Sequence, residues 1–242
     1  HVHAIRVIVA GIHDFGEIHQ PAGEGIGADH IAENGPVGNF RLCHAQKNPS
    51  GPLTIIGSTS SPSLKRIAFE TNHASNNLYA ETLLRGLSLE MTGSACYDSA
   101  YVALGDVFKE LGIALKGADI QDGSGLSRQN YVSADFFCRF LTAMMASPYF
   151  EDYIYTLPSP GSKGTLSGNM KSSAPEVRSR IKVKSGSMNG VRCYSGYVIP
   201  EEGCKDETIV FSIMVNNCTA PTWKLRQLLD KIMAALAEHE VI

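Results

Sequence analysis

Two short polar segments, far apart in the chain, carry side chains suited to holding and polarising a substrate. The first, Ser75-Asn76-Asn77, supplies a hydroxyl and two amides. The second, Lys184-Ser185-Gly186-Ser187, supplies an ammonium group, two hydroxyls and a glycine that would let a ligand backbone lie against a strand. Each segment also has a structural explanation, because serine and asparagine are favoured helix N-caps and lysine protects exposed edge strands. Taken singly, neither segment establishes a site.

Helical patterns surround the first segment. Ser61 is a suitable N-cap with Pro62 at the first helical position, and a helix is predicted from there through Phe69. The Ser75-Asn76-Asn77 segment opens a second helix, in which apolar residues recur with the helical period. These residues are Ala80, Leu83, Leu84 and Leu87. The segment is therefore expected at the junction of two helices.

Two further helices follow before the chain changes character. One is predicted over residues 100–111 and ends at Gly112, a suitable C-cap. The other begins after Ser133 and stops before Pro148, because proline cannot continue a helix.

The second polar segment lies in a part of the chain with strand patterns. Residues 181–184 alternate apolar residues with lysines, which is the period of a strand, and a tight turn is expected over 186–190. Further strands are predicted at 191–199 and at 208–215, and the latter is apolar on both faces and expected to be central. A last helix spans 225–236. Helices followed by strands with short connections predict an α+β fold with an antiparallel sheet flanked by helices.

The composition excludes several classes of function. The chain has 242 residues, of which 43% are hydrophobic and 19% charged, and its net charge is -3. This composition is that of a folded domain rather than of a disordered or fibrous chain. The nearly balanced charge gives no basic surface for nucleic acid, so nucleic acid is not an expected partner. No apolar run approaches the ~20 residues that cross a bilayer.

The cysteines and histidines predict neither a metal site nor a cofactor. The six cysteines fit none of the close zinc spacings, and most are explained as small buried residues. A disulfide among Cys193, Cys204 and Cys218 is the alternative, which the sequence leaves open. Six of the eight histidines lie in the first 50 residues, but only His1 and His3 are closely spaced, without an acidic or cysteine partner in register.

Together and in this order, the two polar segments resemble a known signature. A Ser-x-Asn at a helix start, followed by Lys-Thr/Ser-Gly on a strand, is two-thirds of the penicilloyl-serine transferase signature. The sequence around them resembles the D-alanyl-D-alanine carboxypeptidase/endopeptidase family, the low-molecular-mass class C penicillin-binding proteins, over residues 58–238. The similar segments are residues 73–84, 122–128, 157–166 and 184–197. Ser185 replaces the usual threonine, and Asn76 replaces a frequent aspartate.

The resemblance implies a serine-type acyl transfer, without a cofactor, on peptidoglycan stem peptides that end in D-Ala-D-Ala, which β-lactams mimic. It implies a role for three catalytic residues. Ser75 would relay a proton to the leaving amine, and Asn77 would donate its amide to a substrate carbonyl. Lys184 would supply positive potential that polarises Ser75 and attracts the substrate carboxylate.

The rest of the second segment is implied to bind substrate. Ser185 would hydrogen-bond the substrate carboxylate, and Gly186 would leave room for the substrate to add as a strand. The backbone N–H of Ser187 would form one arm of the oxyanion hole. The resemblance thus implies one cleft with two opposite walls. Ser75 and Asn77 would line one wall, and Lys184 and Ser185 the other.

The first motif of the signature, a Ser-x-x-Lys that holds the nucleophile, is the main departure. Its one match, Ser179-Arg180-Ile181-Lys182, lies directly before the Lys184 strand, where it cannot face the other motifs. The chain also starts at His1 without a methionine. We therefore expect a C-terminal portion of a longer protein. Residues 1–57 are expected to be the tail of an inserted or accessory domain, and 58–242 an incomplete penicillin-binding-protein/β-lactamase-like transpeptidase domain.

Two functions are compatible with these observations. The first is a serine-type D-Ala-D-Ala carboxypeptidase or endopeptidase, periplasmic or extracytoplasmic, of which this chain alone would be inactive. The second is a non-catalytic module that binds peptidoglycan peptides or a partner, such as the missing N-terminal portion or a second copy of the chain. Ser75 favours the first function, because a proton relay has no purpose in a pure binder.

Overall fold

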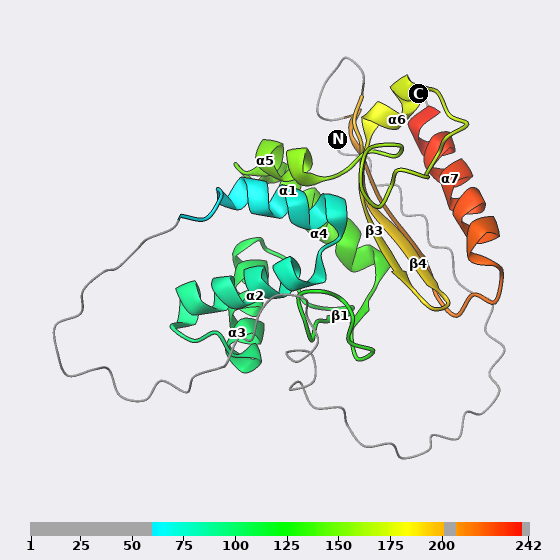
Figure 1. The fold of residues 1–242 in the computed structure, drawn as a ribbon. Coiled ribbons are helices and arrows are strands. Elements are labelled where there is room, and N and C mark those ends of the chain that lie inside the picture. The colour runs from blue at the N-terminus through cyan, green and yellow to red at the C-terminus, as the bar shows by residue number, and fades with distance from the viewer. Residues whose placement is uncertain (1–59, 201–206, 239–242) are drawn as a thin grey trace, which may run out of the picture. The chain divides into compact units, whose positions relative to one another are not determined.

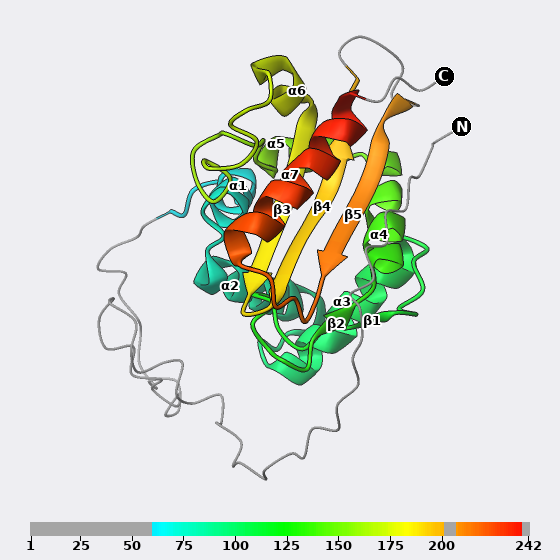
Figure 2. The same cartoon turned by 90° about the vertical axis from the view of Figure 1, so that its right-hand side faces the viewer.

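Three strands with alternating side chains form the sheet that carries the second polar segment. The computed structural model describes residues 60–200 and 207–238. Strands β3 (Ile181–Met188), β4 (Val191–Val198) and β5 (Ile209–Val215) pair antiparallel in the order β3-β4-β5, as Figure 2 shows. The predicted antiparallel sheet is thus confirmed. The expected turn over 186–190 is shorter, because β3 continues to Met188 and only Asn189-Gly190 turns, with Gly190 at a φ of +72°.

Helices cover both faces of this sheet. Helix α7 (Thr222–Glu238) lies on one face, where it packs with Ile181, Val183 and apolar residues of β4 and β5 (Figures 1 and 2). On the other face, α4 (Ala134–Ala146) and α5 (Phe150–Thr156) pack against Tyr197 and Val210. Strand β5 is buried on both faces yet lies at an edge of the described sheet. The described residues therefore do not show the expected central position, and the helices on the two faces account for the burial of β5.

The first polar segment lies between two helices, as expected. Helix α1 (Leu64–Ala74) starts later than predicted, because the Ser63 side chain accepts the capping hydrogen bond, and it runs past Phe69 to Ala74. Helix α2 (Asn77–Thr92) follows, and the Asn76 side chain caps it by accepting the Tyr79 N–H at 3.1 Å. Ser75 is left at the junction of the two helices.

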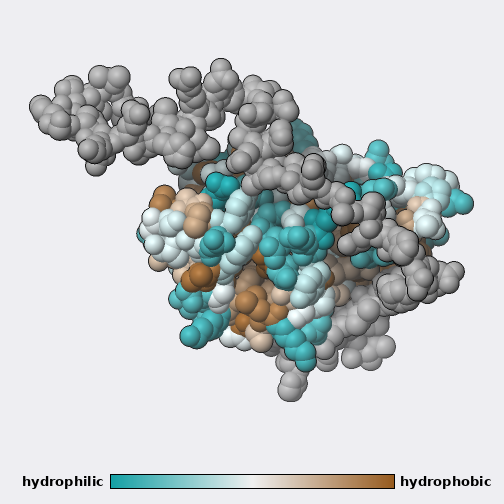
Figure 3. Space-filling view, turned by 90° about the horizontal axis from the view of Figure 1, so that it is seen from below, coloured by the Kyte–Doolittle hydropathy of each residue, from teal (hydrophilic) through white to brown (hydrophobic). Residues whose placement is uncertain are grey.

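A second helical layer contains α2 and α3 (Tyr97–Glu110), which pack against each other. The surface of this part of the molecule, seen from below in Figure 3, is mostly hydrophilic or neutral with separate hydrophobic spots. Four short elements were not predicted, because they are too short to show a periodic pattern. They are α5, α6 (Pro175–Arg180), β1 (Ala118–Asp119) and β2 (Tyr131–Val132).

Several expectations concern residues beyond those described. Residues 1–57 and Cys204 lie outside the described ranges, and the boundary after residue 57 stays a prediction. The described residues from Pro62 onward belong to one compact unit. Cys193 and Cys218 are both free thiols, so no disulfide joins these two. Within residues 60–200 and 207–238, no helix has both the length and the apolar character needed to cross a bilayer.

Candidate active site

Ser75 occupies an unusual backbone conformation at the end of α1. Its φ of 51° and ψ of 51° are left-handed, and its backbone N–H donates to the Thr71 carbonyl to end the helix. This conformation costs roughly 1–2 kcal/mol for a residue with a side chain. Because Asn76 caps α2, the Ser75 hydroxyl is not used for capping. The simple N-cap explanation for Ser75 therefore fails, and its hydroxyl is free for another contact.

Lys184 provides that contact from the sheet. Its Nζ donates to Ser75 Oγ at 2.9 Å and to the Ser185 carbonyl at 2.7 Å. Ser75 and Lys184 are 109 residues apart in the sequence. The side chain is half-buried, and burial lowers the pKa of Lys184 to about 8. No carboxylate among the described residues pairs with it. The two polar segments thus meet in a hydroxyl–ammonium contact.

A loop that precedes α6 joins the two sides of this contact. The Val183 N–H donates to the Pro158 carbonyl at 3.0 Å, and the Thr165 N–H donates to the His73 carbonyl at 3.1 Å. Gly164 has a φ of +104°, and a Cβ there would collide with the same His73 carbonyl. The loop therefore holds the end of α1 against the edge of β3, and a glycine is required for this close approach.

Thr165 also brings a further hydroxyl to the site. Its Oγ1 lies 3.4 Å from Ser185 Oγ, and either atom can be the donor. The sequence comparison included this threonine in a similar segment but gave it no role. Only the fold reveals its position, because Thr165 and Ser185 come from a loop and a strand that meet through tertiary contacts.

The remaining predicted residues lie close in sequence to this cluster. Gly186 and Ser187 are exposed on β3, and Asn77 is exposed as the first residue of α2. A Cβ at Gly186 would meet its nearest neighbour, Cys193 Cβ, at 3.7 Å, so packing inside the chain does not demand glycine there. No hydrogen bond from Asn77 to the cluster is present among the described side chains.

The outer edge of β3 has backbone groups available for a ligand. Val183 uses its N–H outside the sheet, on Pro158. Because backbone groups alternate in direction along a strand, the N–H groups of Ser185 and Ser187 point to this same outer edge. β3 is an edge strand of the described sheet. An extended ligand can therefore pair with it beside Lys184.

Two serines to which the sequence analysis gave no role continue a polar row across the sheet. Ser195 lies opposite Lys184 on β4, and Ser212 lies opposite Ser195 on β5. Their hydroxyls are 2.8 Å apart, and Ser212 is fully buried. Cross-strand partners share a face, so this polar row starts at Lys184. Serines within otherwise apolar strands are the signal that could have revealed it.

The single Ser-x-x-Lys match does not form a serine–lysine pair. Lys182 Nζ donates to Ser159 Oγ at 3.0 Å, whereas Ser179 Oγ donates to the Glu176 carbonyl at 2.7 Å. The two side chains thus have separate partners, in agreement with the expectation that this match is fortuitous.

The arrangement of sheet and helices matches that of known solved structures. Penicillin binding protein 4 from Haemophilus influenzae, solved in complex with a β-lactam, superposes with a TM-score of 0.59 at 23% identity, covering 71% of this chain and 40% of that chain. A β-lactamase from Sphaerobacter thermophilus gives a TM-score of 0.50 at 19% identity, covering 72% of this chain and 62% of that chain. The fold is that of the penicillin-binding proteins and β-lactamases.

The sequence narrows this class to one family. Residues 32–238 match the D-Ala-D-Ala carboxypeptidase 3 (S13) family, and the chain belongs to it. A D-alanyl-D-alanine carboxypeptidase from Actinomadura sp. is 32% identical over 190 residues, which are 76% of this chain and 34% of that protein. A penicillin-sensitive carboxypeptidase A from Dictyostelium discoideum is 30% identical over 187 residues, which are 74% of this chain and 35% of that protein. The chain thus spans about a third of the length of these relatives.

Proposed function

We propose that this chain is part of a serine-type D-Ala-D-Ala carboxypeptidase or endopeptidase that cleaves peptidoglycan stem peptides through an acyl-enzyme. The observation that supports it best is the 2.9 Å contact between Lys184 Nζ and Ser75 Oγ, within a chain of the carboxypeptidase family. The activity would be exerted on the cell wall, outside the cytoplasm.

Ser75 is proposed as the proton relay and Lys184 as the group that polarises it. A hydroxyl that accepts a hydrogen bond from an ammonium group can still donate its own proton to a leaving amine. The positive charge of Lys184 also attracts the carboxylate at the end of the peptide, and its effect is strengthened by partial burial. Asn77 would orient the peptide by donating its amide to a substrate carbonyl.

The substrate is proposed to lie along the free edge of β3. Its terminal carboxylate would accept hydrogen bonds from Ser185 and Thr165, whose hydroxyls are 3.4 Å apart. Gly186 would allow the close approach of the peptide backbone. The outward N–H of Ser187 would be one donor to the oxyanion, a type of contact worth ~3 kcal/mol in the transition state.

The nucleophile is proposed to come from a segment outside this chain. The sequence holds one Ser-x-x-Lys, and its two side chains have other partners. By itself the chain would bind such peptides without hydrolysing them. A purely binding module is the second candidate, and the same Lys184 and Ser185 would serve it.

Covalent labelling by a penicillin tests the proposal. The longer protein that carries this chain is expected to gain the mass of one opened penicillin, detected by mass spectrometry of the intact protein. The 242-residue chain, incubated in the same way, is expected to gain none. The enzymatic proposal would be overturned by a folded longer protein that stays unlabelled, and the binding module would then be the better account.

Binding of a D-Ala-D-Ala peptide by the chain is expected to weaken above about pH 8. Burial lowers the pKa of Lys184 to about 8, so the free side chain is protonated below this pH and loses its charge above it. Once the ammonium is neutral, affinity for a carboxylate falls by at most about tenfold per pH unit. Calorimetric titration with N-acetyl-D-Ala-D-Ala between pH 6 and 9.5 measures this fall.

A matched variant identifies the titrating group. Lys184→Arg keeps its charge throughout this range, because the guanidinium pKa stays above about 12. Its affinity is therefore expected to be flat with pH, even if it is weaker overall. A wild-type affinity that is constant up to pH 9.5 would show that Lys184 does not bind the carboxylate.

A further inference from the structure

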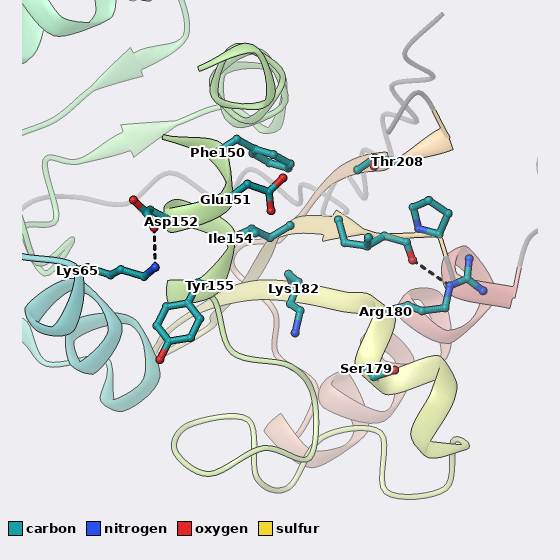
Figure 4. A pocket seen from close by; sticks show the side chains of 12 residues that line it. Lys65, Phe150, Glu151, Asp152, Ile154, Tyr155, Ser179, Arg180, Lys182 and Thr208 are labelled. Carbon is teal, nitrogen blue, oxygen red and sulfur yellow. Dashed lines mark hydrogen bonds and ion pairs between the residues drawn. The ribbon is translucent and has the colours of Figure 1, made fainter. Parts of the chain in front are cut away.

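A separate cavity lies at the beginning of β3, on the face of the sheet that α5 covers (Figure 4). Its volume is about 760 Å³, within the roughly 300–1,000 Å³ of small-molecule sites. Side chains from α1, α5, the end of α6 and the first residues of β3 line it. The residues that line this cavity do not include Ser75, Lys184 or Ser185, so the cavity is distinct from the candidate active site.

One side of the cavity is apolar. Phe150, Ile154 and Tyr155 of α5 line it (Figure 4). Ile199, directly after the end of β4, also lines it. Phe150 is buried and Ile154 half-buried, which fixes their positions, whereas Tyr155 is 53% exposed. An apolar group placed here would remove surface from water on both itself and the protein.

The other side of the cavity carries more cations than carboxylates. Three cations and two carboxylates line the cavity, and one pair, Lys65 and Asp152, is joined at 2.6 Å. Lys182 donates to the neutral Ser159 hydroxyl at 3.0 Å, and Arg180 Nε donates to the Ile199 carbonyl at 3.0 Å. Neither forms an ion pair with a residue in the described ranges. Glu151 supplies the one other carboxylate at the wall.

Lys182 is the side chain for which a bound anion would matter most. It is half-buried, and burial lowers its pKa. Within the described residues it donates to the Ser159 hydroxyl, and a partly desolvated ammonium with a neutral partner gains a charge-assisted hydrogen bond when a carboxylate binds. Arg180 also lines the cavity, and the terminal nitrogens of its guanidinium are not used in an ion pair within the described part, so they are available to donate to a bound carboxylate.

We propose that this cavity binds an organic carboxylate with an apolar body. The carboxylate contacts Lys182 and Arg180, and the body lies against Ile154, Tyr155 and Ile199. This site does not depend on the proposed catalytic function, since none of its residues belongs to the cluster around Lys184. Failure of penicillin labelling would therefore not contradict the carboxylate site proposed here. Failure of carboxylate binding in this cavity would likewise not contradict the proposed peptidase function.

Titration calorimetry of the 242-residue chain with octanoate tests the proposal. One octanoate is expected to bind per chain, and octan-1-ol, which has the same body without the charge, is expected to bind at least about tenfold more weakly. Absence of octanoate binding, or equal affinity for the alcohol, would overturn the proposal.

Two variants locate the site. Lys182→Met keeps the length of the side chain without its charge, and is expected to weaken octanoate binding about tenfold or more. Arg180→Gln is also expected to weaken octanoate binding. It replaces Lys182→Met as the test if thermal melting shows that Lys182→Met does not fold. Lys171→Met, at an exposed position outside the cavity, is the control and is expected to bind as the wild type does. If folded Lys182→Met binds octanoate as tightly as the wild type, the proposed site is contradicted. If Lys182→Met does not fold, unchanged affinity in folded Arg180→Gln contradicts it instead.

Discussion

Replacing Lys184 by methionine in the longer protein is expected to lower the rate of acylation by penicillin about 10²- to 10⁴-fold. The ammonium contacts Ser75 Oγ at 2.9 Å, and without it the serine loses both its hydrogen bond and the positive potential that polarises it. The expected size is that of a group that takes part in proton transfer. Stopped-flow or gel-based measurement with a fluorescent penicillin gives the rate.

The same substitution is expected to leave the protein as stable as before, or more so, near pH 7. Burial lowers the pKa of Lys184, so its unfolded-state pKa is the higher one and the charged form is disfavoured in the folded protein. This cost is fully present below about pH 8 and is relieved progressively as the pH rises from the folded-state pKa toward the higher unfolded-state pKa. Removing the charge removes the cost. A large loss of rate together with an unchanged melting temperature would therefore assign the effect to chemistry.

Lys231→Met is the matched control for this experiment. Lys231 is an exposed lysine on α7, which covers the other face of the sheet, so neither rate nor stability should change. Wild-type acylation by the Lys184→Met variant would contradict the proposed role of the lysine.

Gly164→Ala is expected to lower the free energy of unfolding of the chain by about 2–4 kcal/mol. Two effects add at this position. The φ of +104° is a conformation that residues with a side chain rarely adopt, and the new Cβ would collide with the His73 carbonyl. Because Thr165 donates to this same carbonyl, relief of the collision would also move Thr165 away from Ser185. Urea denaturation measures the stability, and peptide titration measures the associated loss of affinity.

Gly125→Ala separates the two effects. Gly125 also has a positive φ, +78°, but no atom lies within 4 Å of a Cβ built there. Its substitution is expected to cost roughly 1 kcal/mol from backbone strain alone, with peptide affinity unchanged. Equal losses of stability in the two variants would show that the contact between Gly164 and α1 does not matter.

Much of the fold could be predicted because local patterns decide it. The alternation of residues 181–184 gives a strand with its lysines on one face, and the Ser133 side chain caps α4 as predicted. The start of α1 was predicted too early, since Ser61 and Ser63 are both good caps and only the hydrogen bond to Arg66 distinguishes them. The position of β5 in the sheet could not be predicted in the same way, because apolar residues on both faces indicate burial under helices and do not show whether a strand lies at an edge of the described sheet.

The site is predictable to a smaller extent. Sequence singled out Ser75 and Lys184, but it offered capping and edge protection as alternatives, and the structure shows that Asn76 does the capping. Thr165, Ser195 and Ser212 could not be found in the same way. Their significance arises from hydroxyl contacts between segments that are distant in sequence.

The contact between residues 75 and 184 also ties ligand binding to the last stages of folding. Closing a loop of this size is entropically costly, so we expect the contact between α1 and β3 to form late in folding. Non-local contacts of this kind slow folding relative to local ones. A peptide bridging the two sides would bind the native state and not its partly folded precursors, and would raise the midpoint of denaturation with its concentration.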